Sequence, residues 1–253
     1  MSIIIKTPEQ IEGIRRASKL AANILKKLGA SLYIDMKTQE IDDLSMQLTK
    51  EVGAIAAPLN YHGFPKSVCV SVNEVVCHGI PGEYILKDGD IVNIDVTIIK
   101  DGYYGDTSSM FILGNISPEA KKLIEVTKKS LEKGIAQVYP GNYLSNIGYA
   151  IQKYVEKQEY SVVRDYCGHG IGLEFHEEPQ VLHYGRKNRG VLLEPGMIFT
   201  IEPMVNVGGY ECEVDKNDGW TVYTKDRSLS AQFEHTVLVT NKGHEILTLS
   251  SKN

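Results

Sequence analysis

Apolar and polar residues alternate along the segment Val92–Ile98, and this pattern predicts a strand with one apolar face. The pair Asp101-Gly102 follows, and it favours a two-residue hairpin turn because both positions tolerate positive φ. Such a turn pairs Lys100 with Tyr103 and continues into a second strand. The pattern therefore predicts a long antiparallel hairpin.

The register of this hairpin brings two carboxylates together. It places Asp95 opposite Ser108 and Thr97 opposite Asp106, so the two aspartates become diagonal neighbours roughly 7 Å apart, on the face opposite the aliphatic one. Two carboxylates at about 4 Å repel by about 4 kcal/mol where the effective dielectric constant is about 20. A proton, a basic side chain or bound cations must offset that repulsion. The alternative interpretation is a pair of exposed strand carboxylates without a ligand.

Helix signals occur before and after the hairpin. Thr7-Pro8-Glu9-Gln10 combines a capping residue, a first-turn proline and a glutamine three residues after the cap. Ser117-Pro118-Glu119 repeats the cap and the proline, and apolar residues at helical spacing follow both signals. The pattern predicts helices from Thr7 to near Gly29, over 38–52, from Ser117 to Pro140 and over 145–159, with strands over 67–73 and 233–239.

Two motifs recur at a common offset of 107 residues. Residues 168–170 match residues 61–63, and Pro195–Glu202 matches Lys87–Asp95, which places Glu202 on Asp95. A shared offset at separate motifs indicates an internal duplication. Chance recurrence of a helix-helix-strand order is the alternative.

We therefore predict an α/β fold built from two similar halves, at roughly 1–113 and 117–253, which form either one large domain or two small ones. The length of 253 residues, with 42% hydrophobic and 23% charged residues, is that of an ordinary soluble globular protein.

Net charge and cysteine content limit the expected binding partners and the expected cellular compartment. A net charge of −5 implies no bulk attraction to nucleic acid, so we expect no DNA partner. No apolar run reaches membrane-spanning length, and the apolar N-terminal stretch is too short for a signal peptide. The four cysteines have no CxxC spacing, as expected for reduced thiols in a cytoplasmic protein. We expect a monomer.

Five side chains in or beside strand-like segments are candidate metal ligands. Four are carboxylates, which are costly to bury unpaired, and two divalent ions would neutralise their four negative charges. Oxygen-rich ligation with one imidazole suits Mn, Fe, Co or Zn, and the spacing does not choose among them. The candidate ligands are Asp95, Asp106, His169, Glu202 and Glu234.

Motifs spread along nearly the whole chain carry a resemblance. They are Tyr-His-Gly-Phe-Pro (61–65), Val-Cys-His-Gly-Ile-Pro (76–81), Asp-Ile-Val-Asn-Ile-Asp (90–95), Gly-Asp-Thr (105–107), Gly-His-Gly-Ile-Gly (168–172), Phe-His-Glu-Glu-Pro (175–179), Thr-Ile-Glu-Pro (200–203) and Gln-Phe-Glu-His-Thr (232–236). In this order they resemble the type I methionine aminopeptidases of bacterial type. The resemblance implies the pita-bread fold, an α/β (α+β) fold in which a single catalytic domain over residues 1–253 has two pseudo-symmetric halves and a central antiparallel sheet flanked by helices. It also implies a dinuclear metal site that holds the five candidate ligands, with Asp106 and Glu234 bridging the ions.

The resemblance also implies catalytic roles for three residues. His78 matches a proton donor to the leaving nitrogen, and His176 matches the histidine that contacts the substrate carbonyl. Glu202 matches a general base for a metal-bridging hydroxide that attacks the peptide bond. Residues matching the methionine pocket are Tyr61, Phe64, Cys69, Phe175 and Trp220. Backbone oxygens of Ser228 and Ser230 are a weaker candidate site for a monovalent cation, and His183 is expected to be a surface or core residue without a role in the site.

The expected function is removal of the initiator methionine from nascent proteins whose second residue is small. A contact with the ribosome is left open. One alternative is an X-Pro aminopeptidase or dipeptidase of the same fold, although such enzymes usually carry an added N-terminal domain. The other is an inactive binding module, but a non-enzyme has no need to keep four like charges together.

Overall fold

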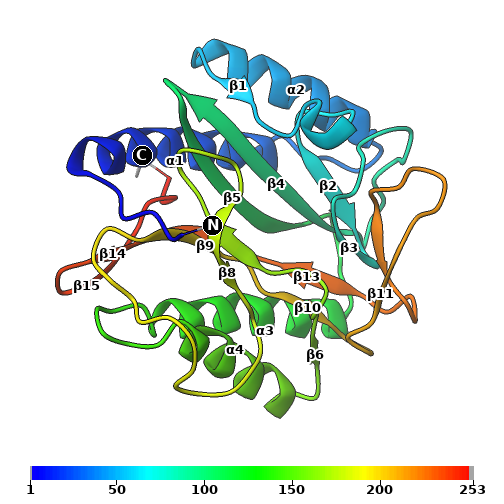
Figure 1. Ribbon diagram of the computed structural model, residues 1–253. Helices are drawn as coiled ribbons and strands as arrows, with labels where there is room; N and C mark the ends of the chain where they lie inside the picture. The colour runs from blue at the N-terminus through cyan, green and yellow to red at the C-terminus, as the bar shows by residue number, and fades with distance from the viewer. Residues whose placement is uncertain (1, 251–253) are drawn as a thin grey trace.

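The computed structural model describes residues 2–250, so the predicted domain limits at 1 and 253 lie outside the described residues. Helices cover both sides of a layer of antiparallel strands (Figure 1). Helices α1 (Pro8–Ala30) and α2 (Thr38–Glu51) lie on one side, and α3 (Pro118–Ile135) and α4 (Ser145–Lys157) on the other. The predicted combination of helices and antiparallel strands is confirmed.

Local side-chain contacts start the helices where the sequence predicts them. The Thr7 hydroxyl accepts the N–H of Gln10, and the Gln10 side chain accepts the N–H of Thr7, which is a capping box. The Ser117 hydroxyl accepts the N–H of Ala120 in the same way. Helix α3 ends before Pro140, earlier than predicted, because Gln137 and Val138 form tighter i→i−3 bonds ahead of the proline.

The central hairpin has the predicted register. Strands β4 (Ile91–Lys100) and β5 (Tyr103–Ile112) pair Lys100 with Tyr103, Asp95 with Ser108 and Thr97 with Asp106. Both turn residues, Asp101 and Gly102, have positive φ, at 53° and 83°. The turn chemistry therefore fixes which residues share a face of the hairpin.

The remaining strands form short antiparallel sheets beside this hairpin. Every strand pairing among residues 2–250 is antiparallel. The hairpin sheet adds β1 (Ile55–Ala56) and β2 (Cys69–Val72), and a five-stranded sheet has the order β15 (Gly243–Ile246), β14 (His235–Thr240), β9 (Ile198–Ile201), β7 (Gly168–Gly170) and β8 (Glu177–Val181). Two three-stranded sheets have the orders β13 (Ser230–Gln232), β10 (Met204–Asn206), β6 (Ser161–Val162) and β11 (Cys212–Val214), β12 (Val222–Thr224), β3 (Val75–Cys77).

Two large hydrophobic cores hold the helices against the strands. One contains Leu28 of α1 and Ile94 of β4, and the other contains Ile147 of α4 and Phe199 of β9. Helix α1 approaches β5 so closely that a Cβ on Gly105 would lie 2.4 Å from the backbone of Ala17. With apolar side chains directed to the helices, the opposite strand faces carry polar groups toward the centre of the molecule.

A buried ion pair fastens the N-terminal segment to the rest of the fold. The Lys6 ammonium contacts the Glu177 carboxylate, and the two side chains are only 1% and 4% exposed. The same carboxylate accepts the backbone N–H groups of Leu173 and Glu174. The pair therefore ties the N-terminal segment to the loop between β7 and β8.

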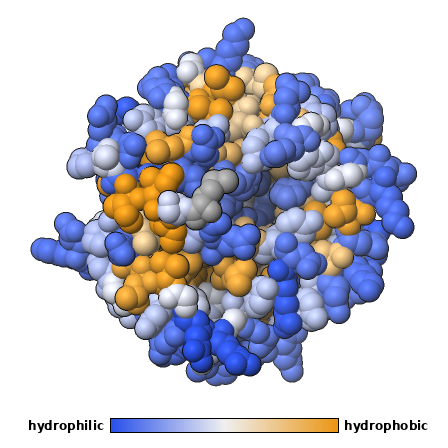
Figure 2. All heavy atoms as spheres, viewed as in Figure 1, coloured by the Kyte–Doolittle hydropathy of each residue, from blue (hydrophilic) through white to orange (hydrophobic). Residues whose placement is uncertain are grey.

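The outer surface is mainly hydrophilic, with hydrophobic side chains gathered in patches on the face seen in Figure 2. Ile4 and Ile5 of the N-terminal segment are among the exposed apolar residues. Within residues 2–250 no helix combines the length and the apolar character needed to cross a membrane.

The Lys6→Met variant should lose about 3–5 kcal/mol of unfolding free energy, because it leaves the Glu177 carboxylate buried without its partner. Urea denaturation at pH 7 measures the loss. The matched control is Lys37→Met, which breaks an exposed pair with Glu83 and should leave the urea midpoint nearly unchanged. Equal losses in the two variants would contradict this account.

Candidate active site

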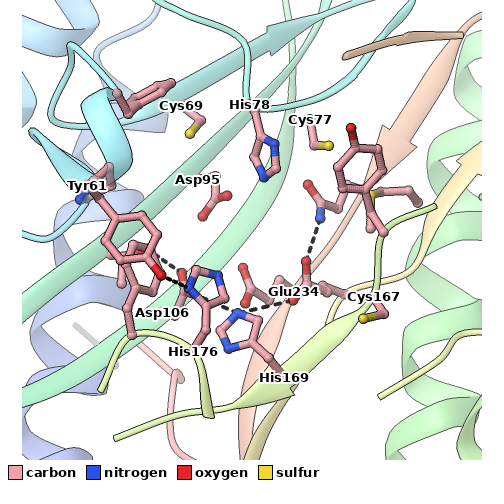
Figure 3. A pocket seen from close by; sticks show the side chains of 18 of the residues that line it. Tyr61, Cys69, Cys77, His78, Asp95, Asp106, Cys167, His169, His176 and Glu234 are labelled. Carbon is pink, nitrogen blue, oxygen red and sulfur yellow. Dashed lines mark hydrogen bonds and ion pairs between the residues drawn. The ribbon is translucent and has the colours of Figure 1, made fainter. Parts of the chain in front are cut away.

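A cavity of about 600 Å³ lies among the polar strand faces at the centre of the molecule (Figure 3). Its lining includes all five predicted metal ligands, Asp95, Asp106, His169, Glu202 and Glu234. In Figure 3, the labelled side chains of Asp95, Asp106, His169 and Glu234 point toward a common space. The structure therefore brings together residues that are far apart in the sequence.

Strand pairing positions these side chains. Asp95 and Asp106 come from the facing strands β4 and β5. Glu202 follows β9 and Glu234 precedes β14, and the pairing of these strands places Ile201 opposite His235. Strand pairing therefore brings Glu202 close to Glu234, as it brings Asp95 close to Asp106.

Two hydrogen bonds join the strand systems that carry the two carboxylate pairs. The backbone N–H of Glu234 donates to the carbonyl of Ser108 at 3.1 Å. The Thr236 hydroxyl donates to the carbonyl of Asp106 at 2.7 Å. These contacts link β14 to β5, so the four carboxylates belong to one connected framework.

Three of the five residues form a group suited to a metal ion. One ligand atom from each of Asp106, His169 and Glu234 lies within 4.8 Å of the others. His169 Nε2 is 3.7 Å from oxygens of both Asp106 and Glu202. His169 Nδ1 donates to the carbonyl of Gly170 at 3.0 Å, so the Nε2 lone pair faces the carboxylates.

Burial raises the pKa of all four carboxylates, and repulsion from neighbouring carboxylates adds to the rise at three of them. Burial raises the pKa of Asp106 to about 7 and that of Glu202 to about 8. Burial, followed by repulsion from neighbouring carboxylates, raises the pKa values of Asp95 and Glu234 well above their usual range. Asp95 Oδ1 and Glu234 Oε1 are buried and have no hydrogen-bond partner among residues 2–250. These unpaired oxygens, together with the exposed lone pair of His169, fit the ligand set of a divalent cation.

Three polar residues around the carboxylates were not predicted from the sequence. Thr97 donates to Asp106 and Thr200 to Glu202, each at 2.7 Å, and Gln232 donates to Glu202 at 3.2 Å. Each lies two positions from a predicted ligand and therefore on the same side of its chain segment. This two-residue spacing from a predicted ligand was the signal in the sequence that could have identified them.

His183 also has a place in the site that the sequence did not indicate. It is buried, as a core residue should be, but its Nε2 accepts the backbone N–H of Glu202 at 3.1 Å. Burial lowers the pKa of His183 to about 3, so the ring is neutral. His183 therefore supports the chain next to a carboxylate ligand.

Two further histidines border the cavity. His78 adopts a left-handed backbone conformation (φ 55°), and its ring contacts the rings of Tyr166 and Trp220. Burial lowers the pKa of His78. His176 lies with its ring centroid 4.2 Å from that of His169. Both predicted catalytic imidazoles are therefore next to the carboxylate cluster.

An aromatic and sulfur-containing wall completes the cavity. Phe64 packs edge-on against Trp220 with 5.3 Å between ring centroids, and Tyr61 packs against Phe175 at 4.8 Å. Burial raises the pKa of the Cys69 thiol well above its usual value, so this sulfur stays protonated. The structure thus places all five predicted pocket residues at the cavity.

Comparisons with known proteins agree with this geometry. Residues 12–241 match metallopeptidase family M24. The chain is 57% identical over 251 residues to the methionine aminopeptidase of Escherichia coli strain K12, covering 98% of this chain and 95% of that protein. The crystal structure of methionine aminopeptidase from Rickettsia prowazekii superposes with a TM-score of 0.97 at 53% identity, covering 98% of this chain and all of that one.

A more distant structural neighbour shares the fold alone. The prolidase from Pyrococcus furiosus has a TM-score of 0.78 at 22% identity, and the match covers only 66% of that chain. The X-Pro-cleaving alternative is therefore not favoured, and the predicted pita-bread fold is confirmed. The chain belongs to metallopeptidase family M24.

Proposed function

We propose that this protein is a metal-dependent aminopeptidase that removes the N-terminal methionine from nascent proteins whose second residue is small. The observation that carries the proposal is the group formed by Asp106, His169 and Glu234, whose ligand atoms lie within 4.8 Å at the base of an aromatic cavity. The two relatives at 57% and 53% identity, from Escherichia coli and Rickettsia prowazekii, carry the name methionine aminopeptidase. Membership of a metallopeptidase family implies use of a divalent metal.

Two divalent ions are proposed for this site. Asp95, Asp106, Glu202 and Glu234 carry four negative charges when ionised, which two divalent ions would neutralise, and His169 supplies a neutral nitrogen. Asp106 and Glu234 are proposed to bridge the ions. The oxygen-rich set suits Mn, Fe, Co or Zn. When bound, such an ion pair activates water as a nucleophile and polarises the carbonyl of the scissile bond.

The residues around the ions have separate proposed roles. Glu202, whose pKa is raised to about 8, is suited to hold a proton taken from the attacking water. His176 is proposed to donate a hydrogen bond to the substrate carbonyl as negative charge develops there. His78 is proposed to donate a proton to the leaving nitrogen.

The cavity wall suits a methionine side chain. Rings of Tyr61, Phe64, Phe175 and Trp220 surround apolar space, and a polarisable thioether interacts favourably with aromatic rings and with a thiol such as Cys69. Apolar walls above buried carboxylates provide different surroundings for the first side chain of the substrate and for its peptide bond. They would bind the side chain of the first residue while its peptide bond lies at the ions.

An internal duplication within a single catalytic domain remains part of this proposal. Helices α2 and α4 begin 107 residues apart, and so do strands β4 and β9, which supports halves at roughly 1–113 and 117–253. One motif argues for divergence, because residues 61–63 form a 3₁₀ turn whereas residues 168–170 form a strand. The pseudo-repeat would explain why each half contributes one carboxylate pair.

The substrate implies a cytoplasmic location, where nascent N-termini are produced, and we propose a monomer. Any contact with the ribosome stays a prediction.

A monovalent cation near Ser228 and Ser230 also stays a prediction. In the structure the carbonyl of Ser228 accepts a hydrogen bond from Thr224, and Ser230 is buried in β13.

Peptide hydrolysis tests the activity. With a divalent ion supplied, the protein should cleave Met-Ala-Ser much faster than Ala-Pro-Ala, because the aromatic wall selects the methionine side chain. Chromatographic assay of released amino acid measures both rates. A preference for Ala-Pro-Ala would overturn the methionine assignment in favour of the X-Pro alternative.

The His78→Asn variant should reduce kcat by roughly 10²–10⁴ while leaving the metal content unchanged, because His78 acts on the leaving group and is not a ligand. Asparagine is chosen because it tolerates the left-handed backbone at this position. Elemental analysis and peptide hydrolysis measure the two effects, with His244→Asn as a control outside the cavity. Loss of metal from the His78 variant would show that its assigned role is wrong.

In a chelating buffer, stability should fall as pH rises from about 6.5 to about 8. Asp106 and Glu202 have folded-state pKa values of about 7 and about 8, whereas unfolded carboxylates are already ionised near pH 4. The folded state therefore holds more protons in this window, and its stability decreases as they leave. The buried imidazoles of His169 and His183, with pKa values of about 4 and about 3, act in the opposite direction, but mainly below pH 6.5, where unfolded histidines are largely protonated.

Urea midpoints at pH 6.5 and pH 8 measure this dependence. Excess Mn²⁺ should abolish the decline, because it binds the ionised carboxylates of the folded state. The Asp106→Asn variant should show a smaller decline in chelator and less stabilisation by Mn²⁺. A midpoint that rises between pH 6.5 and pH 8 in chelator would refute this reading of the carboxylates.

A further inference from the structure

Two neighbouring imidazoles in the cavity have different hydrogen-bond partners at Nδ1. The rings of His169 and His176 lie 4.2 Å apart between centroids (Figure 3). His169 Nδ1 is bonded to the carbonyl of Gly170, which can only accept, so Nδ1 carries the proton. His176 Nδ1 lies 2.8 Å from the hydroxyl oxygen of Tyr61, a group that can donate or accept. The tautomer of His176 therefore depends on the direction of one hydrogen bond.

Both partners of that bond are neutral. Burial, with the nearby charge of Glu174 and the phenol of Tyr104 contributing, raises the pKa of Tyr61, so the hydroxyl keeps its proton. Although His176 is open to the cavity, desolvation and the imidazoles beside it hold its pKa well below its usual value. A neutral imidazole has one N–H, and the other nitrogen offers a lone pair.

We propose that the Tyr61 hydroxyl donates to His176 Nδ1 and thereby fixes His176 as the tautomer protonated at Nε2. Tyr61 is then a positioning residue as well as part of the pocket wall. The two adjacent imidazoles would hold opposite tautomers. His169 would present a lone pair toward the carboxylate cluster, and His176 would present an N–H toward the cavity.

The reverse direction of the bond is less favourable at both residues. If Nδ1 donated to Tyr61, the phenol hydrogen would have to turn to water, because the bond to His176 is the one that this hydroxyl makes among the described residues. The Nε2 lone pair of His176 would also face the cavity, where it would repel the carbonyl oxygen of a bound peptide. Donation by Tyr61 avoids both costs and aims a donor at the position where negative charge develops.

The backbone around Tyr61 is arranged to hold its ring in place. Asn60 and His62, on either side, have left-handed φ values of 66° and 47°, a backbone conformation that non-glycine residues adopt infrequently. Backbone bonds at 2.9 Å from Tyr61 to Pro58 and from Phe64 to Tyr61 keep this turn closed. Strained residues that persist next to a site often serve its geometry.

Ring packing restricts the same contact from the other side. Phe175 stacks on His176 with 4.4 Å between centroids and packs against Tyr61 at 4.8 Å. Rotation of either the phenol or the imidazole would disturb this three-ring arrangement. The bond between Tyr61 and His176 is therefore held by a turn on one side and by an aromatic ring on the other.

The use of this N–H on a peptide carbonyl rests on the proposed function, but the tautomer itself does not. Long-range ¹H–¹⁵N correlation spectra of ion-free protein, labelled with ¹⁵N-histidine and recorded near pH 7.5, report which nitrogen of each ring is protonated. The signals of His176 are assigned by their loss in His176→Asn. We expect protonation at Nε2 for His176 and at Nδ1 for His169.

The Tyr61→Phe variant keeps the ring and removes the donor, so His176 should shift to a mixture of tautomers or to the Nδ1-protonated form. The control is Tyr104→Phe, which alters another ring stacked on Phe175 without a bond to His176 and should leave the tautomer unchanged. Protonation of His176 at Nδ1 in the unaltered protein would overturn the proposal. So would a spectrum of Tyr61→Phe in which His176 stays fully protonated at Nε2.

Kinetics separate positioning from pocket formation. In the metal-loaded enzyme, Tyr61→Phe should lower kcat for Met-Ala-Ser about 3- to 10-fold, as expected for one lost hydrogen bond, with KM changed less than about twofold. An unchanged kcat with a raised KM would overturn the positioning role. Absence of turnover in the unaltered, loaded protein would instead overturn the proposed function, and the spectra would still decide the tautomer.

Discussion

Mutual repulsion among four buried carboxylates is the constraint on which the site depends. Asp95, Asp106, Glu202 and Glu234 are held together although burial raises all four pKa values and like charge adds to the rise at Asp95, Glu202 and Glu234. A fold retains such a cluster only if strong local structure fixes each side chain and a cation or proton neutralises it. Paired strands, two threonine hydroxyls and a glutamine amide supply the first requirement, and the lone pair of His169 favours a metal for the second.

Local chemistry explains the part of the fold that could be predicted from the sequence. The Asp101-Gly102 turn fixes the β4–β5 register, and cap residues fix the starts of α1 and α3. These features depend on a few adjacent residues, so they can be read without knowledge of the tertiary structure. Four candidate ligands were inferred as carboxylates in or beside strand-like segments, with His169 as the fifth, and the set was then matched through the family resemblance. All five line one cavity.

The contacts that escaped prediction are those between distant segments. Nothing in the sequence around Lys6 indicates a partner at Glu177, and nothing around His183 indicates the backbone of Glu202. The bond between Tyr61 and His176 likewise joins segments that meet only in the folded chain. Such pairs depend on where loops cross, which is set by the packing of whole elements and not by local pattern.

The alternation of side chains along the central hairpin also limits which mutations its strands can accept. Because side chains alternate across a strand, adding or deleting one residue between Asp95 and the turn would swing that carboxylate into the aliphatic layer of Ile94 and Val96. A substitution along these strands alters one contact, whereas an indel would dismantle the cluster. Over evolutionary time the two strands should therefore accept many substitutions but almost no insertions or deletions.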